Sequence, residues 1–350
     1  MDRRIYRIID VNIDRAREGL RVIEDTMRFI FEKRELTERA RELRQEISNL
    51  PSALNISLPK LLSSRESEAD LGREREEQQR GDTLEIVSSN FSRVEESIRV
   101  IEEYSRILNV KATPQIKKIR FEVYTLQKKI HLTLHRKNRV SKLGLYIITD
   151  EEIAGKSHQR IAIEAVKGGA DTIQLRDKKN STRKILQEAH QMRRIIPEDK
   201  VLFIINDRAD ITVACDGDGV HLGKDDLPVQ QVREIIGESK LIGVSCDNVE
   251  EAEKAEEAGA DYISLGPIFY TTTKEGLPPP VGTEIITEAK KRISIPLVAI
   301  GGIDEDNMED VLKAGADSIA LISAALKRTD IAKSVKSLKE NFLSITGKNS

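Results

Sequence analysis

The sequence predicts an α/β protein in which an all-α helical bundle with an internal duplication precedes a C-terminal (β/α)8 TIM barrel. Three observations predict this fold. Only three of the 20 glycines lie before residue 141, a polar motif occurs twice within that glycine-poor half, and short apolar runs alternate with amphipathic stretches after it. We therefore expect two domains, at 1–137 and 143–346, joined by a linker at 138–142.

The composition excludes several classes of protein. The 57 basic and 59 acidic residues give a formal net charge of −2, which excludes a polybasic nucleic-acid-binding protein. Two cysteines, Cys215 and Cys246, are too few for a disulfide framework or a zinc cluster. The N-terminal residues lack the apolar core of a signal peptide, and no stretch approaches 18 apolar residues. We therefore expect a cytoplasmic protein that binds neither nucleic acid nor membranes.

The helical half contains a duplication. The motif at 12–28 recurs at 90–106, an offset of 78 residues, and each copy is followed by a second amphipathic pattern, at 34–49 and 114–136. This arrangement predicts two related helix pairs around a pseudo-twofold axis. The aligned identities are Asn12/Asn90, Arg15/Arg93, Glu18/Glu96, Arg21/Arg99, Val22/Val100, Ile23/Ile101, Glu24/Glu102 and Arg28/Arg106.

The polar identities of this motif recur every three residues from Asn12 to Arg21, which places them along one side of a helix. Two interpretations stay open. The stripe is a solvated, salt-bridged face, or the two stripes meet in a charged pocket where arginines bind phosphate. Segment 63–82 adds arginines and is long enough to be a lid or a disordered loop. The sequence contains no P-loop motif, so nucleotide binding here would be of another kind.

In the second half, eight apolar, β-branched runs alternate with helical stretches. Eight strand–loop–helix units in about 205 residues fit a closed parallel barrel better than an open sheet. Three of the helical stretches end in GGAD or AGAD, where glycine stops the helix before the next strand. The predicted strands are 145–149, 172–176, 202–206, 219–223, 241–245, 262–266, 296–301 and 318–323.

The chemistry of such barrels takes place at the carboxyl ends of the strands. Arg176 and Lys178 follow the second predicted strand, Asp207 follows the third and Asp226 follows the fourth. These residues suit a phosphorylated substrate and a pyrophosphate bound through Mg²⁺. This ion takes a few carboxylates and shares its other positions with water and phosphate oxygens.

Gly301-Gly302 and Ile322-Ser323 end the last two strands, at the usual phosphate site of a barrel. A tight turn would also explain the glycine pair, but Ser323 at the next strand end favours phosphate binding. His221 is either a hydrogen-bonded strand-end histidine or an acid–base group. Neither cysteine belongs to a histidine-paired motif, so we expect no cysteine nucleophile.

The ordered motifs QLRDK, IND, GVHLGKDD, GVS, GPIFYTTTK, AIGGI and LIS resemble those of thiamine-phosphate synthases over residues 143–345. This resemblance implies that hydroxymethylpyrimidine diphosphate is joined to thiazole phosphate through a pyrimidine carbocation. The products would be thiamine phosphate and pyrophosphate, with Mg²⁺ as cofactor. The segment IIDVNIDRAREGLRVIED resembles a helical domain fused to some of these enzymes. That resemblance implies a kinase for hydroxymethylpyrimidine phosphate with ATP as co-substrate, and it assigns no residues.

The barrel resemblance also assigns site residues, motif by motif. It implies that Asp207 and Asp226 bind Mg²⁺. The implied catalytic residues are Arg176, Lys178, Ser245 and Lys274. The residues implied to bind the pyrimidine diphosphate are Gln174, Arg176, Lys178, Asn206, Ser245 and Lys274, and those implied to bind the thiazole phosphate are Thr271, Thr273, Gly302, Ile322 and Ser323. A dissociative step requires that water be excluded, so we expect the Gly/Pro-rich segment 269–282 to close over the site.

Two features depart from the pattern common in this family, and two other functions stay open. The stretch Cys246-Asp247-Asn248 and Lys224 differ from the family's usual residues, which bears on rate or pocket shape. A thiazole tautomerase-like barrel would isomerise the thiazole instead of coupling it, and it would not need the paired aspartates. A ligand-sensing barrel could use the helical half as a dimerisation scaffold, giving a homo-oligomer.

Overall fold

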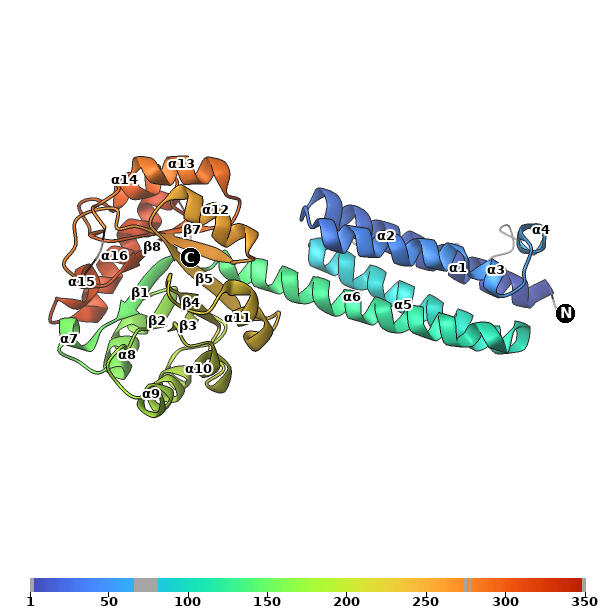
Figure 1. Ribbon diagram of the computed structural model, residues 1–350, viewed down its shortest axis with the longest axis horizontal. Coiled ribbons are helices and arrows are strands. Elements are labelled where there is room, and N and C mark those ends of the chain that lie inside the picture. The colour runs from blue at the N-terminus through green and yellow to red at the C-terminus, as the bar shows by residue number, and fades with distance from the viewer. Residues whose placement is uncertain (1–2, 66–80, 274–275, 277, 348–350) are drawn as a thin grey trace. The chain divides into compact units, whose positions relative to one another are not determined.

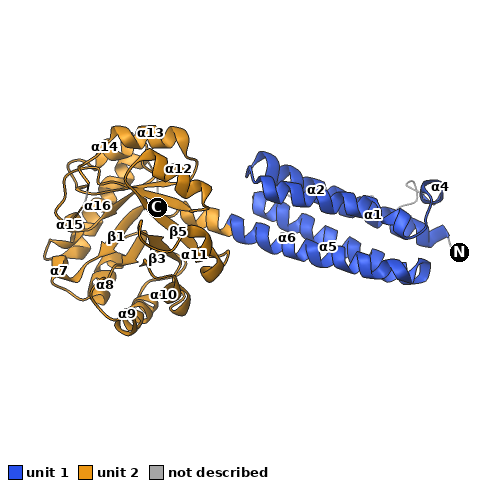
Figure 2. Ribbon diagram, viewed as in Figure 1, with its two compact units in different colours: residues 1–134 blue, residues 135–350 orange. Residues whose placement is uncertain are grey.

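The computed structural model describes residues 3–65, 81–273, 276 and 278–347. Lys274 lies outside the described residues, as do most of segment 63–82 and part of 269–282. The chain divides into two compact units, Met1–Leu134 and His135–Ser350 (Figure 2). The sequence predicted a linker at 138–142, and residues 138–140 form the end of the helix α6 (Thr113–Val140). Among the described helices, none is both long and apolar enough to cross a membrane.

The first unit is helical throughout its regular structure. Its elements are α1 (Arg3–Phe29), α2 (Arg34–Ser48), α3 (Leu50–Ala53), α4 (Leu58–Leu62), α5 (Thr83–Leu108), the 3-10 turn η2 (Val110–Ala112) and most of α6. The four predicted helices are present, and α1 and α5 extend well beyond the repeated motif. Helix α1 buries apolar residues at helical spacing, from Ile9 through Ile13 and Leu20 to Met27, and these pack into one core with α2, α5 and α6.

The duplication extends to individual contacts. The side-chain amide of Asn12 donates to the carbonyl of Ile8 at 2.8 Å, and that of Asn90 donates to the carbonyl of Ile86 at 2.8 Å. Because these positions are 78 residues apart, the two copies of the motif use their asparagines in the same way.

The two glutamates of the motif are buried and bound by arginines. Glu24 accepts from the Nε atoms of Arg41 and Arg44 at 3.0 and 2.9 Å, and Glu102 accepts from Nε of Arg120 at 2.7 Å. Arginine hydrogen bonds hold the pKa of Glu24 below its ordinary value, although burial, the largest single effect, opposes them. These two identities of the motif are therefore structural.

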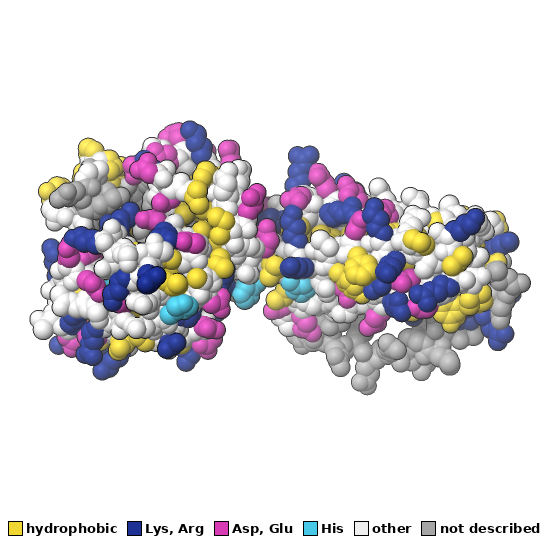
Figure 3. Space-filling model, turned by 60° about the horizontal axis from the view of Figure 1, so that its bottom comes forward, with side chains coloured by type: hydrophobic (Ala, Val, Ile, Leu, Met, Phe, Trp, Pro, Cys, Tyr) yellow, Lys and Arg dark blue, Asp and Glu magenta, His cyan; other side chains and the backbone are white. Residues whose placement is uncertain are grey.

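Other identities of the stripe have no such contact. Arg15, Glu18, Arg93 and Glu96 are all exposed. Within the described part of the chain, none of the four forms a hydrogen bond or an ion pair. The polar identities of the motif thus include buried members with hydrogen bonds, the exposed Arg21 and Arg99, which form ion pairs, and these four exposed residues, which form none. Over the face drawn in Figure 3, basic and acidic side chains are interspersed, in keeping with the near-neutral net charge.

The second unit is a closed parallel barrel with strand order β1-β2-β3-β4-β5-β6-β7-β8, in which β1 pairs with β8 (Figure 1). The fold class predicted from the sequence is therefore confirmed. The strands are β1 (Leu145–Thr149), β2 (Thr172–Leu175), β3 (Leu202–Asn206), β4 (Gly219–Leu222), β5 (Leu241–Cys246), β6 (Tyr262–Leu265), β7 (Leu297–Ile300) and β8 (Ser318–Leu321). Each lies within a residue or two of its predicted bounds, because buried β-branched runs bounded by polar residues mark strands well.

Helices surround the barrel. They are α7 (Glu151–Ala154), α8 (His158–Gly168), α9 (Thr182–Ile195), α10 (Ala209–Ala214), α11 (Val229–Ile236), α12 (Val249–Glu257), α13 (Glu284–Arg292), α14 (Met308–Lys313), α15 (Ser323–Leu326) and α16 (Ile331–Thr346). The glycines of the three repeated GGAD and AGAD segments, Gly169, Gly259 and Gly315, have φ of 89°, 96° and 109°, so each ends its helix in a left-handed conformation. The main core lies between the strands and these helices.

Candidate functional site

A cavity opens at the carboxyl ends of the strands, and it brings together most of the residues predicted for the site. Its lining includes Gln174, Arg176, Lys178, Asn206, Asp207, Ser245, Thr271, Thr273, Gly302, Ile322 and Ser323. Asp226 lies just outside the lining, against Asp207. Lys274 is outside the described residues. The residues come from seven of the eight strand ends, so closure of the barrel is what assembles them.

A chain of hydrogen bonds crosses the floor of the cavity. Gln174 donates from Nε2 to the Tyr146 hydroxyl at 2.8 Å, and that hydroxyl lies 3.2 Å from the hydroxyl of Tyr262. His221 continues the chain, with Nδ1 3.2 Å from the Tyr262 hydroxyl and Nε2 3.0 Å from Oγ of Ser245. The chain therefore fixes the orientation of Gln174 and Ser245, which the sequence had marked as substrate-binding.

The two tyrosines are functional candidates that the sequence analysis missed. Tyr146 and Tyr262 are the aromatic residues of two strands that are otherwise mostly aliphatic, and that contrast was the available signal. Gly243 on β5 leaves the room they need, because a Cβ there would lie 2.1 Å from Cζ of Tyr262 and 2.5 Å from Nδ1 of His221. The glycine of the GVS motif is thus a steric requirement of the cavity floor.

His221 is a hydrogen-bonded histidine that stays neutral at neutral pH. Burial lowers its pKa to about 4, although the Asp207 carboxylate opposes this. Cys246 also lines the cavity, and burial raises the pKa of its thiol to about 12, so it is not a thiolate. Both results favour a site that works by charge placement over one that relies on a strong base or a nucleophile.

On one side of the cavity, which we call its cationic side, Arg176 and Lys178 each lie close to a carboxylate. Lys178 Nζ lies 3.1 Å from Oδ2 of Asp207, and Arg176 Nη1 lies 3.4 Å from Oδ2 of Asp150. The Oδ2 atom of Asp226 accepts from the backbone N–H of Gly223 at 2.6 Å. Burial and the neighbouring Asp207 carboxylate raise the pKa of Asp226, although the Gly223 N–H and Lys178 oppose them.

The Asp207 and Asp226 pair fits a hard divalent cation. Two carboxylates held together at a partly buried site repel each other, and a cation between them removes that cost. Mg²⁺ is commonly bound by one or two carboxylates together with water and phosphate oxygens. In the described part of the chain, no group of three or more His, Cys, Asp or Glu side chains forms a complete metal cage. Such an ion would therefore take its remaining ligands from water and from phosphate oxygens.

The opposite side of the cavity is built from backbone and hydroxyl groups. Gly301 and Gly302 have φ of 100° and 65°, and a Cβ on Gly302 would lie 2.5 Å from the carbonyl oxygen of Tyr270. Thr271 donates from Oγ1 to Oγ1 of Thr273 at 3.0 Å. This side thus combines close backbone approach with hydroxyl groups, which suits a phosphate.

Comparison with known proteins identifies the family. Residues 145–325, more than half of the chain, match the family model described as thiamine monophosphate synthase. The chain belongs to this family. A thiamine-phosphate synthase from Nostoc punctiforme is 37% identical over 327 residues, covering 92% of this chain and 90% of that protein. One from Prochlorococcus marinus subsp. pastoris is 39% identical over 334 residues, covering 94% of this chain and 93% of that protein.

Family membership confirms the resemblance drawn from the barrel motifs, and the protein is an enzyme of thiamine biosynthesis. A solved thiamine phosphate pyrophosphorylase from Pyrococcus furiosus is 37% identical, with a TM-score of 0.55, and the match covers 59% of this chain and 98% of that one. Residues 7–129 match a second family model, ThiD2. The Nostoc and Prochlorococcus relatives align over both units, so the fusion of helical unit and barrel is shared.

Proposed function

We propose that the barrel joins hydroxymethylpyrimidine diphosphate to thiazole phosphate, forming thiamine phosphate and releasing pyrophosphate. The observation that carries this proposal is the cavity itself. On one side the cavity offers the cations Arg176 and Lys178 together with the Asp207 carboxylate, and on the other it offers the phosphate-binding groups of Gly302 and Ser323. Two phosphorylated substrates can therefore lie in one cavity with their uncharged rings between these two sides.

The proposed reaction breaks one bond and forms another. The methylene C–O bond of the pyrimidine breaks with its electron pair leaving on pyrophosphate, and the thiazole nitrogen then donates a pair to the resulting carbocation. Arg176 and Lys178 neutralise the charge that develops on the leaving group. Mg²⁺ bound by Asp207 and Asp226 would act there as a Lewis acid. The floor residues Gln174, Tyr146 and His221 hold the pyrimidine side of the cavity in one hydrogen-bonded arrangement.

We further propose that residues 1–137 phosphorylate hydroxymethylpyrimidine phosphate with ATP, which would supply the barrel with its diphosphate substrate. The match of residues 7–129 to the ThiD2 family supports this proposal. The exposed, unpaired Arg15 and Arg93, which occupy equivalent positions in the two copies of the motif, are suited to phosphate groups.

One reaction mixture tests both activities. The intact chain is given hydroxymethylpyrimidine monophosphate, ATP, thiazole phosphate and Mg²⁺, and thiamine phosphate is measured. A parallel mixture replaces the monophosphate and ATP with the diphosphate, which isolates the barrel reaction. Thiamine phosphate in both mixtures supports both proposals. Thiamine phosphate only in the mixture with the diphosphate supports the coupling reaction and refutes the kinase proposal. If neither mixture yields thiamine phosphate, the coupling proposal is wrong, and the tautomerase-like and ligand-sensing functions are the ones left to test.

A further inference from the structure

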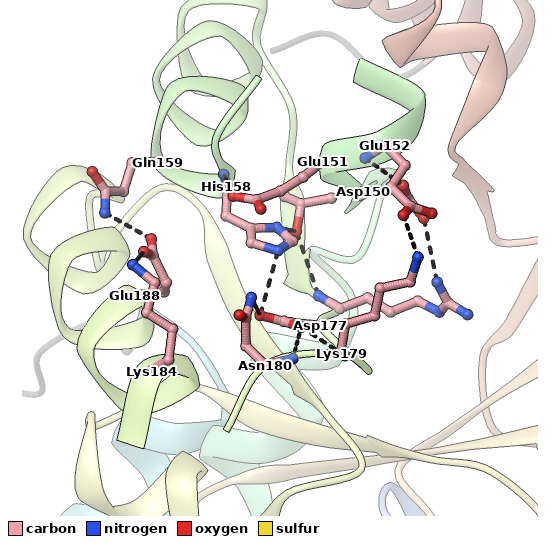
Figure 4. Close-up of polar contacts among 12 residues, drawn as sticks. Asp150, Glu151, Glu152, His158, Gln159, Asp177, Lys179, Asn180, Lys184 and Glu188 are labelled. Carbon is pink, nitrogen blue, oxygen red and sulfur yellow. Dashed lines mark hydrogen bonds and ion pairs between the residues drawn. The ribbon is translucent and has the colours of Figure 1, made fainter. Parts of the chain in front are cut away.

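A buried polar cluster lies behind the cationic side of the cavity, and none of its three central residues is among those that line the cavity. Thr149 ends β1 and is fully buried, and His158 begins α8 and is 3% exposed. The side chain of Asp177, in the loop after β2, is 4% exposed. Figure 4 shows the ring of His158 directed toward Asp177. Three separate elements thus meet at one point, next to the backbone of Arg176.

The hydroxyl of Thr149 binds the backbone on both sides of Leu175. It donates to the carbonyl of Gln174 at 3.1 Å and accepts from the N–H of Arg176 at 3.4 Å. Nδ1 of His158 lies 2.7 Å from the same hydroxyl. The tautomer of His158 sets which of the two atoms donates, and in either case the ring is hydrogen-bonded to the hydroxyl that holds the backbone of Arg176.

Asp177 holds the following turn. Its Oδ1 accepts from the N–H groups of Lys179 and Asn180, each at 3.0 Å, and its Oδ2 accepts from Nδ2 of Asn180 at 2.8 Å. Nε2 of His158 lies 3.9 Å from Oδ2 of Asp177. Hydrogen bonds from Asn180 and Lys179 hold the pKa of Asp177 below its ordinary value, although burial, the largest single effect, opposes them. The carboxylate therefore stays ionised and keeps its bonds to the turn.

Residues 176–178 alternate between the two environments. Arg176 and Lys178 line the cavity, and Asp177 between them points into the buried cluster. The cluster therefore holds the segment from behind while its two cations face the substrate. Arg176 is anchored at both ends, since Thr149 binds its backbone N–H and Asp150 lies 3.4 Å from its guanidinium.

We propose that Thr149, His158 and Asp177 are positioning residues that set Arg176 and Lys178 against the leaving pyrophosphate. The inference rests on the proposed coupling reaction. A dissociative step gains most from cations already in place when the bond breaks, because no reorganisation is then needed. Loosening the cluster lets the two cations drift from the diphosphate, but it leaves the thiazole side of the cavity untouched, since no group of the cluster reaches that side.

Two matched pairs of variants test this proposal in the full-length protein. Thr149→Val removes the hydroxyl and keeps the shape of the side chain, whereas Thr149→Ser keeps the hydroxyl. His158→Leu removes the ring nitrogens, whereas His158→Asn offers an amide group close to the position of Nδ1, which can hydrogen-bond to the Thr149 hydroxyl. Binding of magnesium pyrophosphate is measured by calorimetry. Steady-state coupling rates then give kcat and a separate KM for each substrate, and circular dichroism reports folding.

We expect Thr149→Val and His158→Leu to weaken pyrophosphate binding and to lower kcat/KM for the pyrimidine diphosphate by about 10- to 100-fold, the scale of a misplaced catalytic group. The KM for thiazole phosphate should not change, and Thr149→Ser and His158→Asn should stay near wild type. Equal loss for both substrates, or equal loss in both members of a pair, would overturn the proposal. If Thr149→Val does not fold, the His158 pair decides. If the wild type shows no coupling, the proposed reaction is refuted. The binding of magnesium pyrophosphate to the variants would still test whether the cluster positions Arg176 and Lys178.

Discussion

Protonation of His221 should destabilise the barrel as the pH falls. Burial lowers the pKa of this side chain in the folded protein from 6.5 to about 4, so the unfolded chain takes up a proton first. The stability that the neutral ring contributes is complete above pH 6.5 and is lost as the pH falls toward 4. Linkage gives a loss of about 2 kcal/mol at pH 5 and about 3 kcal/mol at pH 4. The loss of stability is the cost of placing a charged imidazolium in a buried position beside Tyr262 and Ser245.

The assay compares wild type with His221→Gln, which has no group that titrates in this range and leaves every other titrating group in place. Urea unfolding at pH 7 and pH 5 is followed by hydrogen exchange and mass spectrometry of peptides from β4 and β5, which report the barrel alone. With an m-value of about 2 kcal/mol/M, the midpoint of the wild type should fall by about 1 M more than that of the variant. Equal shifts in the two proteins would refute the reasoning, because the lost stability would then arise elsewhere.

Three further outcomes are expected. Asp207→Asn should lower coupling at least about 100-fold with folding intact, and the exposed Asp225→Asn is its control; an unchanged rate would contradict the metal assignment. Gly243→Ala should destabilise the barrel by about 2 kcal/mol in urea unfolding, because its Cβ overlaps Tyr262; wild-type stability would mean that the floor can shift. Arg15→Ala should lower phosphorylation of hydroxymethylpyrimidine phosphate without changing stability. Arg17→Ala, which removes a cation outside the repeated identities, should change neither phosphorylation nor stability. Equal losses of phosphorylation in the Arg15 and Arg17 variants would mean that only the net charge matters.

The sequence predicted the strands and the rim of the barrel closely, but not the chain of hydrogen bonds beneath the rim. Strand positions depend on local patterns, and each strand end such as Asn206-Asp207 can be read from a few neighbouring residues. The bond between Tyr146 and Tyr262 joins residues 116 apart, and their strands β1 and β6, which do not pair with one another, come close only when the barrel closes. His221 could be interpreted in two ways because its partners could not be identified without that closure. The contact between His158 and Asp177 could not be predicted for the same reason, because helix α8 and strand β2 separate the two residues in the sequence.

The duplication within the helical unit separates structural from functional residues in a way that a single copy could not. Where both copies keep a residue and also keep its contact, the fold itself explains the identity. This holds for Asn12 and Asn90, whose amides bind equivalent carbonyls, and for Glu24 and Glu102, which are buried against arginines. Arg15 and Arg93 are kept without any such contact in the described residues, so packing does not explain them. A residue that stability does not require in either copy is the residue to expect at a phosphate-binding surface.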